Sequence, residues 1–122
     1  MDKTTNTELA IIGAGPGGYT AAFRAADLGS EVTLIDKSIN LGGVCLNRGC
    51  IPSKAFLQLS HIIDEADKSR FKGVLFDKPT IDISKVNNWK NDIINKLTSG
   101  IKSLSKQRNI KIINGIASFL SA

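Results

Sequence analysis

Three glycines near the N-terminus constrain this 122-residue chain more than any other feature. Gly13, Gly15 and Gly18 fit the pattern G-x-G-x-x-G, which follows the apolar run "ELAII" (8–12) and precedes the alanine-rich "YTAAFRAADLG" (19–29). A short apolar run is typical of a buried strand, and alanine favours helix. The pattern therefore leaves a strand and opens a helix, which is the context in which it indicates a dinucleotide-binding turn.

Each residue of the turn has its own physical role. Gly13 permits the tight turn, Gly15 has no Cβ to obstruct a diphosphate, and Gly18 lets helix and strand pack closely. Unpaired N–H groups and a partial positive charge at the helix N-terminus attract phosphates. Pro16 suits the first helical turn, because no N–H bond is lost there.

Asp36 directly follows the next apolar run, "EVTLI" (31–35). An acidic residue about 20 residues after the turn accepts hydrogen bonds from ribose hydroxyls and repels a 2′-phosphate. Residues 9–35 thus have the order and length of a βαβ unit. The alternative is a structural glycine turn with a surface aspartate, and the motif alone does not separate NAD from FAD.

The rest of the chain continues this alternation. Apolar residues recur at helical spacing in "SKAFLQLSHIIDEADKSRF" (53–71) and again over residues 86–104. "NIKII" (109–113) predicts a third strand, and Asn114-Gly115 predicts a turn into "IASFL" (116–120), which we expect to begin another strand.

Short apolar runs separated by helices indicate an α/β fold, a Rossmann-like parallel sheet with helices on both faces. In the usual order the first strand pairs with the second on one side and with a further strand on the other. Because no later segment supplies that further strand, we expect an incomplete domain with an unpaired sheet edge.

Charge and hydropathy exclude several classes of protein. The net charge is +5, but the basic residues form no long block, and no aromatic residues are interleaved with them in a row. We therefore expect the basic residues to lie on solvent-exposed surfaces and do not expect nucleic-acid binding. No stretch approaches the roughly 20 apolar residues of a membrane span. The N-terminus lacks the features of a signal peptide, so we expect a cytoplasmic protein.

Both cysteines lie in "GGVCLNRGCIPSK" (42–54). Positions five apart in a straight helix are rotated by about 140°, so Cys45 and Cys50 would not bridge across regular helix. Pro52 cannot donate to the carbonyl of Arg48, which breaks or kinks any helix there and makes a local disulfide feasible.

Such a pair has several possible uses. As a staple it would be weak, because closing so small a loop contributes only about 2 kcal/mol. A metal site would need further ligands, because His61 is the one histidine of the sequence. A third possibility is that both cysteines are buried thiols without a chemical role. In a cytosolic protein we favour a labile redox disulfide, with Lys54 and the following helix stabilising a thiolate.

A dinucleotide turn followed, one βαβ unit later, by G-G-x-C-x4-C resembles the flavoprotein disulfide reductases, the pyridine-nucleotide disulfide oxidoreductase family. "IIGAGPGGY" and "LGGVCLNRGCIPSK" are most similar to the dihydrolipoamide dehydrogenases among them, and the resemblance runs through essentially the whole chain. Glutathione and mercuric reductases share the cysteine frame. "CLN" and "IPSK" favour the lipoamide enzymes, and Arg48 stands where valine is common, without an explanation from the sequence.

The resemblance implies FAD in the first nucleotide site, with phosphates at the glycine turn, ribose at Asp36 and Lys54 near the reactive flavin nitrogen. It also implies that residues 37–45 run along the cofactor and that the backbone of Gly115 and Ala117 lies by the adenine. Cys45 would exchange with the dithiol substrate, and Cys50 would face the flavin as the charge-transfer thiolate. Electrons would pass from dihydrolipoamide through the disulfide and FAD to NAD+. The implied cofactor residues are Gly13, Gly15, Pro16, Gly18, Asp36, Lys37, Gly42, Gly43, Val44, Cys45, Lys54, Gly115 and Ala117.

The implied partners are the lipoyl domains of 2-oxo acid dehydrogenase complexes and a second copy of the enzyme in a homodimer. Members of this family are several-fold longer, so residues 1–122 would be the N-terminal part of the FAD-binding domain. The NAD domain, the interface domain and the catalytic His-Glu pair would be absent, and His61 matches no catalytic position. We expect such a segment by itself neither to hold FAD tightly nor to turn over. The alternatives are a segment of a glutathione or mercuric reductase, or a truncated non-catalytic nucleotide-binding module.

Overall fold

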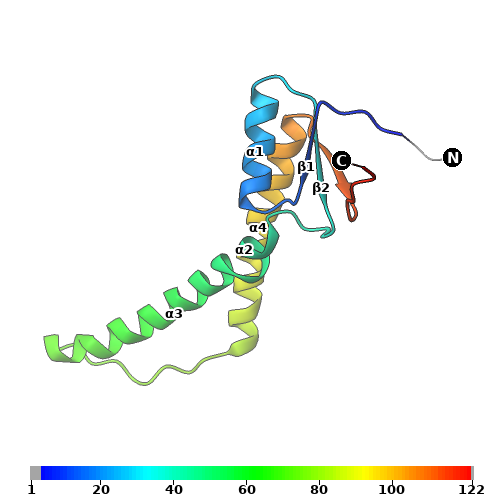
Figure 1. Cartoon of the computed structure of the whole chain (residues 1–122). Coiled ribbons are helices and arrows are strands. Elements are labelled where there is room, and N and C mark those ends of the chain that lie inside the picture. Colours follow the sequence, from blue (N-terminus) through cyan, green and yellow to red (C-terminus); the bar gives the residue numbers. More distant parts are fainter. Residues whose placement is uncertain (1–3, 122) are drawn as a thin grey trace.

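The computed structural model describes residues 4–121 and alternates strands with helices, as the sequence predicts (Figure 1). An apolar strand, a glycine turn and an alanine-rich helix open the chain, and Gly29, at φ +95°, follows that helix. In chain order the elements are β1 (Leu9–Ile12), α1 (Pro16–Asp27), β2 (Val32–Asp36), α2 (Gly43–Arg48), α3 (Cys50–Lys68), a 3₁₀ helix (Ser69–Lys72), α4 (Ile83–Gln107) and β3 (Lys111–Asn114).

The three strands form one parallel sheet in the order β1-β2-β3. Leu34 in the middle strand pairs with Ile11 on one side and with Ile112 on the other. β1 pairs with β2 on one side, and no strand within residues 4–121 lies on its other side. The parallel α/β sheet and its unpaired edge agree with the expectation from the sequence.

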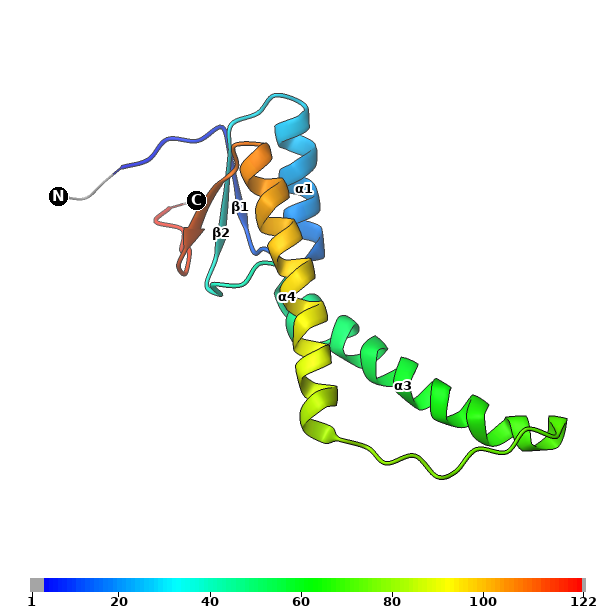
Figure 2. The same ribbon diagram turned by 180° about the vertical axis from the view of Figure 1, so that it is seen from behind.

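Both long crossover helices cover the same face of this sheet, so the prediction of helices on both faces is wrong. In Figures 1 and 2, α1 and α4 lie side by side, and the opposite face of the strands is open. The physical reason is the strand order: two right-handed crossovers that step in the same direction place both helices on one side. Ala22, Leu34 and Ile101 are buried between these layers, whereas Ile12 and Ile113 on the open face are exposed.

α3 and the first half of α4 project from the sheet as an arm (Figures 1 and 2). The predicted apolar ladder does form a helix, but Trp89, Leu97 and Leu104 stay about 40% exposed and only Ile101 is buried. Length explains the exposure of Trp89 in the projecting half: the 25 residues of α4 extend about 37 Å, whereas a five-residue strand covers about 17 Å. Neither helix of the arm, nor any other helix of the described part, is long and apolar enough to cross a membrane.

The expected strand at residues 116–120 does not form. After β3 the backbone N–H of Gly115 donates to the carbonyl of Asp36 at 2.9 Å, and the chain then continues without regular structure. A strand needs a neighbour for its backbone groups, and no strand of residues 4–121 lies beside this segment. The turn was correctly predicted, and its continuation was not.

Arg108 ties the C-terminal end of α4 to that of α1. Its Nε donates to Oδ1 of Asp27 at 2.8 Å, and its guanidinium lies 4.9 Å from the centroid of the Phe23 ring. Its side chain is only 26% exposed, so both contacts are partly shielded from water. This contact joins the two covering helices outside the core.

We expect the substitution Arg108→Met to lower the free energy of unfolding by about 1 kcal/mol, because it removes an ion pair and a cation–π contact together. Urea denaturation of the protein measures this. The matched control is Arg70→Met, whose pair with Asp67 is more than half exposed and should contribute less than about 0.5 kcal/mol. Equal losses in the two variants would contradict the assigned role of Arg108.

Candidate functional site

The glycine turn has the geometry that a dinucleotide requires. Gly13 has φ +100°, a conformation that favours glycine, and its N–H donates to the carbonyl of Ile35 at 2.7 Å. A Cβ atom at Gly18 would overlap the carbonyl oxygen of Gly13, so helix and turn are in direct backbone contact. At Gly15 no atom lies within 4 Å of the position that a Cβ would take. α1 begins at Pro16, as predicted, so its N-terminus faces this open space.

A second glycine pair packs against the first turn. Gly43 has φ +63°, and a Cβ there would lie 2.6 Å from Cα of Gly15. The N–H of Gly42 donates to the carbonyl of Ala14 at 2.8 Å. These contacts place the start of α2, and with it the cysteine segment, directly beside the glycine turn.

Asp36 lies at the carboxyl end of β2 and accepts two backbone hydrogen bonds. Ala14 donates to its Oδ2 at 2.6 Å, and Ser38 donates to its Oδ1 at 2.7 Å. Burial raises the pKa of this carboxyl, but the hydrogen bonds from Ala14 and from Ser38, helped by the charge of Lys37, outweigh burial and hold the pKa below its ordinary value. Asp36 is therefore an ionised acceptor at neutral pH.

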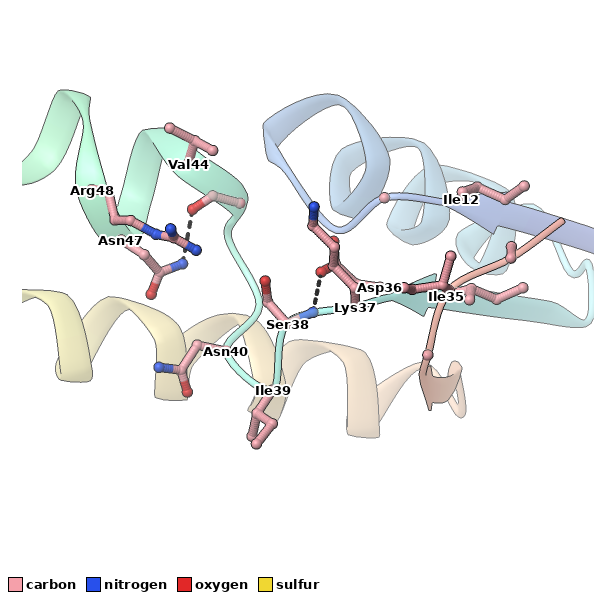
Figure 3. Close-up of a pocket in the computed structure, with 15 residues that line it drawn as sticks. Ile12, Ile35, Asp36, Lys37, Ser38, Ile39, Asn40, Val44, Asn47 and Arg48 are labelled. Atoms are coloured by element: carbon pink, nitrogen blue, oxygen red, sulfur yellow. Dashed lines mark hydrogen bonds between the residues drawn. The ribbon is translucent and has the colours of Figure 1, made fainter.

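A cavity of about 700 Å³ opens at this end of the sheet (Figure 3). Four segments that are distant in sequence form its wall: the end of β1, the end of β2 with the loop that follows, α2, and the turn after β3. Of the residues predicted to bind a cofactor, the wall contains Gly13, Asp36, Lys37, Gly43, Val44, Gly115 and Ala117. The predicted residues outside it are Gly15, Pro16, Gly18, Gly42, Cys45 and Lys54.

Sequence reasoning missed other residues of the wall. Ile12 and Ile35 belong to the open face of the sheet, and strand alternation combined with the rule that ligands bind at carboxyl ends of parallel strands identifies them. Ile116 follows the carboxyl end of β3, so the same rule applies to it. Asn47 and Arg48 carry no such signal, because they reach the wall only when α2 folds back. The wall residues that sequence reasoning missed are Ile12, Ile35, Asn47, Arg48 and Ile116.

The two cysteines form a disulfide at the junction of two helices. Cys45 lies in α2 and Cys50 is the first residue of α3, with Cα atoms 4.7 Å apart. The helix breaks at Gly49, directly after Arg48. Pro52 has no N–H to donate to the Arg48 carbonyl, so a continuous helix would lack that hydrogen bond. Pro52 itself sits in the first turn of α3, where a proline loses no hydrogen bond. The predicted break and the predicted local disulfide are both present.

Cys50 lies at a helix N-terminus, the position at which we expect a thiolate to be stabilised. It begins a helix of 19 residues, and no acidic residue lies in the first turn of that helix to offset the partial positive charge. Cys50 is exposed and Cys45 half-buried, so the pair is open to exchange. Lys54 follows one turn later on the same helix and is exposed, and its effect on a thiolate stays a prediction.

His61 lies on the exposed surface of α3, in a cluster with Asp64 and Glu65 whose candidate ligand atoms are within 4.8 Å of one another. The Asp64 carboxylate already pairs with Lys68 at 2.5 Å. None of these residues lines the cavity. The cluster is adequately explained as a charged helix surface.

Known proteins match this chain over nearly its whole length. The family model of the pyridine nucleotide-disulphide oxidoreductases matches residues 7–122. Proteins named dihydrolipoyl dehydrogenase are similar to it: 52% identical in Buchnera aphidicola from Acyrthosiphon pisum, 48% in Geobacillus stearothermophilus and 46% in Vibrio parahaemolyticus. The alignments cover 98–99% of this chain but only 25–26% of each relative, so the chain spans about a quarter of their length.

Replacing Gly18 tests the close contact between helix and turn. We expect Gly18→Ala to lower the free energy of unfolding by about 3 kcal/mol, because the new methyl group would overlap the Gly13 carbonyl and force the helix to shift. The control is Gly100→Ala in α4, where no atom lies within 4 Å and alanine should stabilise by about 0.5–1 kcal/mol. Thermal unfolding of the two variants should therefore move in opposite directions, and a neutral Gly18→Ala would refute the contact.

Acid unfolding tests Asp36. Its folded-state pKa lies below the ordinary value of 3.8, so it stabilises the fold above that pH, and this contribution is lost as the pH falls through the lower folded value. Asp36→Asn should be less stable than the parent at pH 7, and the difference should shrink between about pH 4 and pH 2. Paired urea titrations over that range measure it. A difference that is independent of pH would contradict the role of the charge.

Proposed function

The chain belongs to the pyridine nucleotide-disulphide oxidoreductase family, and from that premise we propose that it is the N-terminal part of a dihydrolipoamide (dihydrolipoyl) dehydrogenase. Residues 1–122 would carry the FAD site and the redox disulfide, while the NAD site, the subunit interface and the catalytic base would belong to other parts of the enzyme. The observation that carries the proposal is the position of the Cys45–Cys50 disulfide. The helix that contains Cys45 packs against the glycine turn through the contact of Gly43 with Gly15.

The residues of the cavity fit FAD. The space at Gly15 leaves room for a diphosphate before the N-terminus of α1, and the ionised Asp36 is an acceptor suited to ribose hydroxyls. Oδ1 of Asn47 is buried at the same wall and has no hydrogen-bond partner within the described part of the chain. A cavity of this volume is also in the range of known cofactor sites.

In the proposed arrangement the glycine turn binds the phosphates and Asp36 binds the ribose. The backbone around Gly115 and Ala117 lies by the adenine, and residues 37–45 run along the cofactor. Lys54 would approach the reactive flavin nitrogen, an assignment that the family resemblance supports. FAD, when bound, supplies the two-electron acceptor between the cysteines and NAD+.

The chemistry of the chain itself is dithiol–disulfide exchange. A thiolate of dihydrolipoamide attacks Sγ of Cys45, the Cys45–Cys50 bond breaks, and Cys50 leaves as a thiolate stabilised by the N-terminus of α3. The second lipoyl thiol then attacks the lipoyl sulfur of the mixed disulfide and releases Cys45. The substrate loses two electrons and two protons and becomes the cyclic disulfide, and the cysteine pair gains the two electrons.

Proton transfer needs a base that residues 4–121 do not place beside the disulfide. His61 lies about three turns beyond Cys50 along α3, too far to act there. In this proposal the base comes from elsewhere in the enzyme. The proposed partners are lipoyl domains of 2-oxo acid dehydrogenase complexes and a second subunit. The proposed location is the cytoplasm, where a close cysteine pair is expected to be redox-active and not structural.

Assays of the complete gene product test the proposal. We expect NAD+ reduction with dihydrolipoamide and little activity with glutathione disulfide or Hg²⁺, which would identify the other disulfide reductases. Either Cys45→Ser or Cys50→Ser should lower turnover by at least about a thousandfold, because a lone thiol cannot form the disulfide that accepts the electrons.

The two cysteine variants also separate the roles of the sulfurs. Cys45→Ser leaves the Cys50 thiolate, which should give a charge-transfer absorption with bound flavin, and Cys50→Ser should lack that band. Both variants should keep the flavin. A purified protein without flavin, or one that prefers glutathione disulfide, would refute the proposed enzyme.

A further inference from the structure

One cation in the cavity wall has no role in the function proposed so far. Arg48 is the last residue of α2, and its guanidinium points into the space in front of α2 (Figure 3). It forms no ion pair with any carboxylate of residues 4–121, and the side chain is exposed. Its charge is therefore available to a ligand.

The backbone at Arg48 is held on both sides. Before it, the Asn47 side chain donates to the carbonyls of Leu41 at 3.2 Å and Gly43 at 2.9 Å, which fastens α2 to the preceding loop. After it, the Cys45–Cys50 disulfide closes over Gly49 and fastens α2 to α3. Because the backbone of Arg48 is already fixed, less conformational freedom is lost when its side chain binds a ligand.

The charges of the wall fit an anion. Its ionised side chains are Asp36, Lys37 and Arg48, and the carboxylate of Asp36 is already engaged by two backbone N–H groups. Asp36 and Lys37 cancel, so Arg48 makes the side-chain charge of the wall positive, on top of the positive N-terminus of α1. A diphosphate of two negative charges is complementary to that field.

We propose that Arg48 binds a phosphate group of the dinucleotide, from the α2 side of the cavity. The planar guanidinium offers paired N–H donors that match phosphate oxygens, which a lysine offers less well and an uncharged residue not at all. This inference rests on the proposed function, since it concerns a ligand of the same site. It assigns a role to the residue that the sequence left unexplained.

The test compares nucleotide fragments on the flavin-free form of the complete protein. Arg48→Met removes the charge and keeps most of the length, Arg48→Lys keeps the charge, and Arg24→Met makes the same charge change on α1, outside the cavity wall. Titration calorimetry with ADP and with adenosine then isolates the phosphate contribution. We expect Arg48→Met to raise the Kd for ADP about tenfold, as one lost charge-assisted contact should, with adenosine unchanged.

Salt dependence gives a second readout. The ADP difference between the parent and Arg48→Met should shrink as ionic strength rises, and Arg48→Lys should lie between the two. If circular dichroism shows that Arg48→Met is unfolded, Arg48→Gln replaces it in the same comparison.

The outcomes are distinguishable. If the parent binds neither FAD nor ADP, the proposed function of the site is wrong. If the parent binds both and Arg48→Met matches Arg24→Met, only the role of Arg48 is wrong. If Arg48→Met changes the KM for a lipoyl substrate while ADP binding is unchanged, Arg48 faces the partner protein, which also overturns the inference.

Discussion

The backbone crossing of Gly43 over Gly15 is the contact on which the rest of the site depends. No side chain fits between these two residues, and the adjacent hydrogen bond from Gly42 to Ala14 fixes their relative position. Through this crossing, α2 and the disulfide lie beside a dinucleotide turn that is separated from them by a strand and a helix. The two halves of the proposed redox site, the cavity and the disulfide, are thereby joined by backbone, which does not change rotamer when a ligand enters.

Asp36 connects the same region to the sheet. Its carboxylate accepts N–H groups from the first turn and from the loop after β2, and its carbonyl accepts the N–H of Gly115 after β3. Three wall segments therefore share one residue. The Asp36 carboxylate both connects the wall segments and gives the cavity a negative charge. Local stability and the charge offered to a ligand therefore depend on the same ionised state.

Local patterns made much of this predictable. The strand–turn–helix around Gly13, the break imposed by Pro52 and the helix over residues 83–107 depend on residues close in sequence, and each formed as expected. Burial was less predictable. The apolar ladder of α4 indicates one buried side, but the helix is longer than the strands, so Trp89 lies on the projecting arm and stays exposed.

By itself, the sequence determined the parallel α/β class, the glycine turn and the cysteine pair at a helix break, because these follow from spacing and from the stereochemistry of glycine and proline. It also indicated the family, through the resemblance of its two motifs to those of known proteins. Only the tertiary structure decided that both crossover helices share one face, that residues 116–120 form no strand, and that Arg48 joins Asp36 and Lys37 at one cavity. Those outcomes depend on strand order and on contacts between segments far apart in the chain, and no local pattern specifies either.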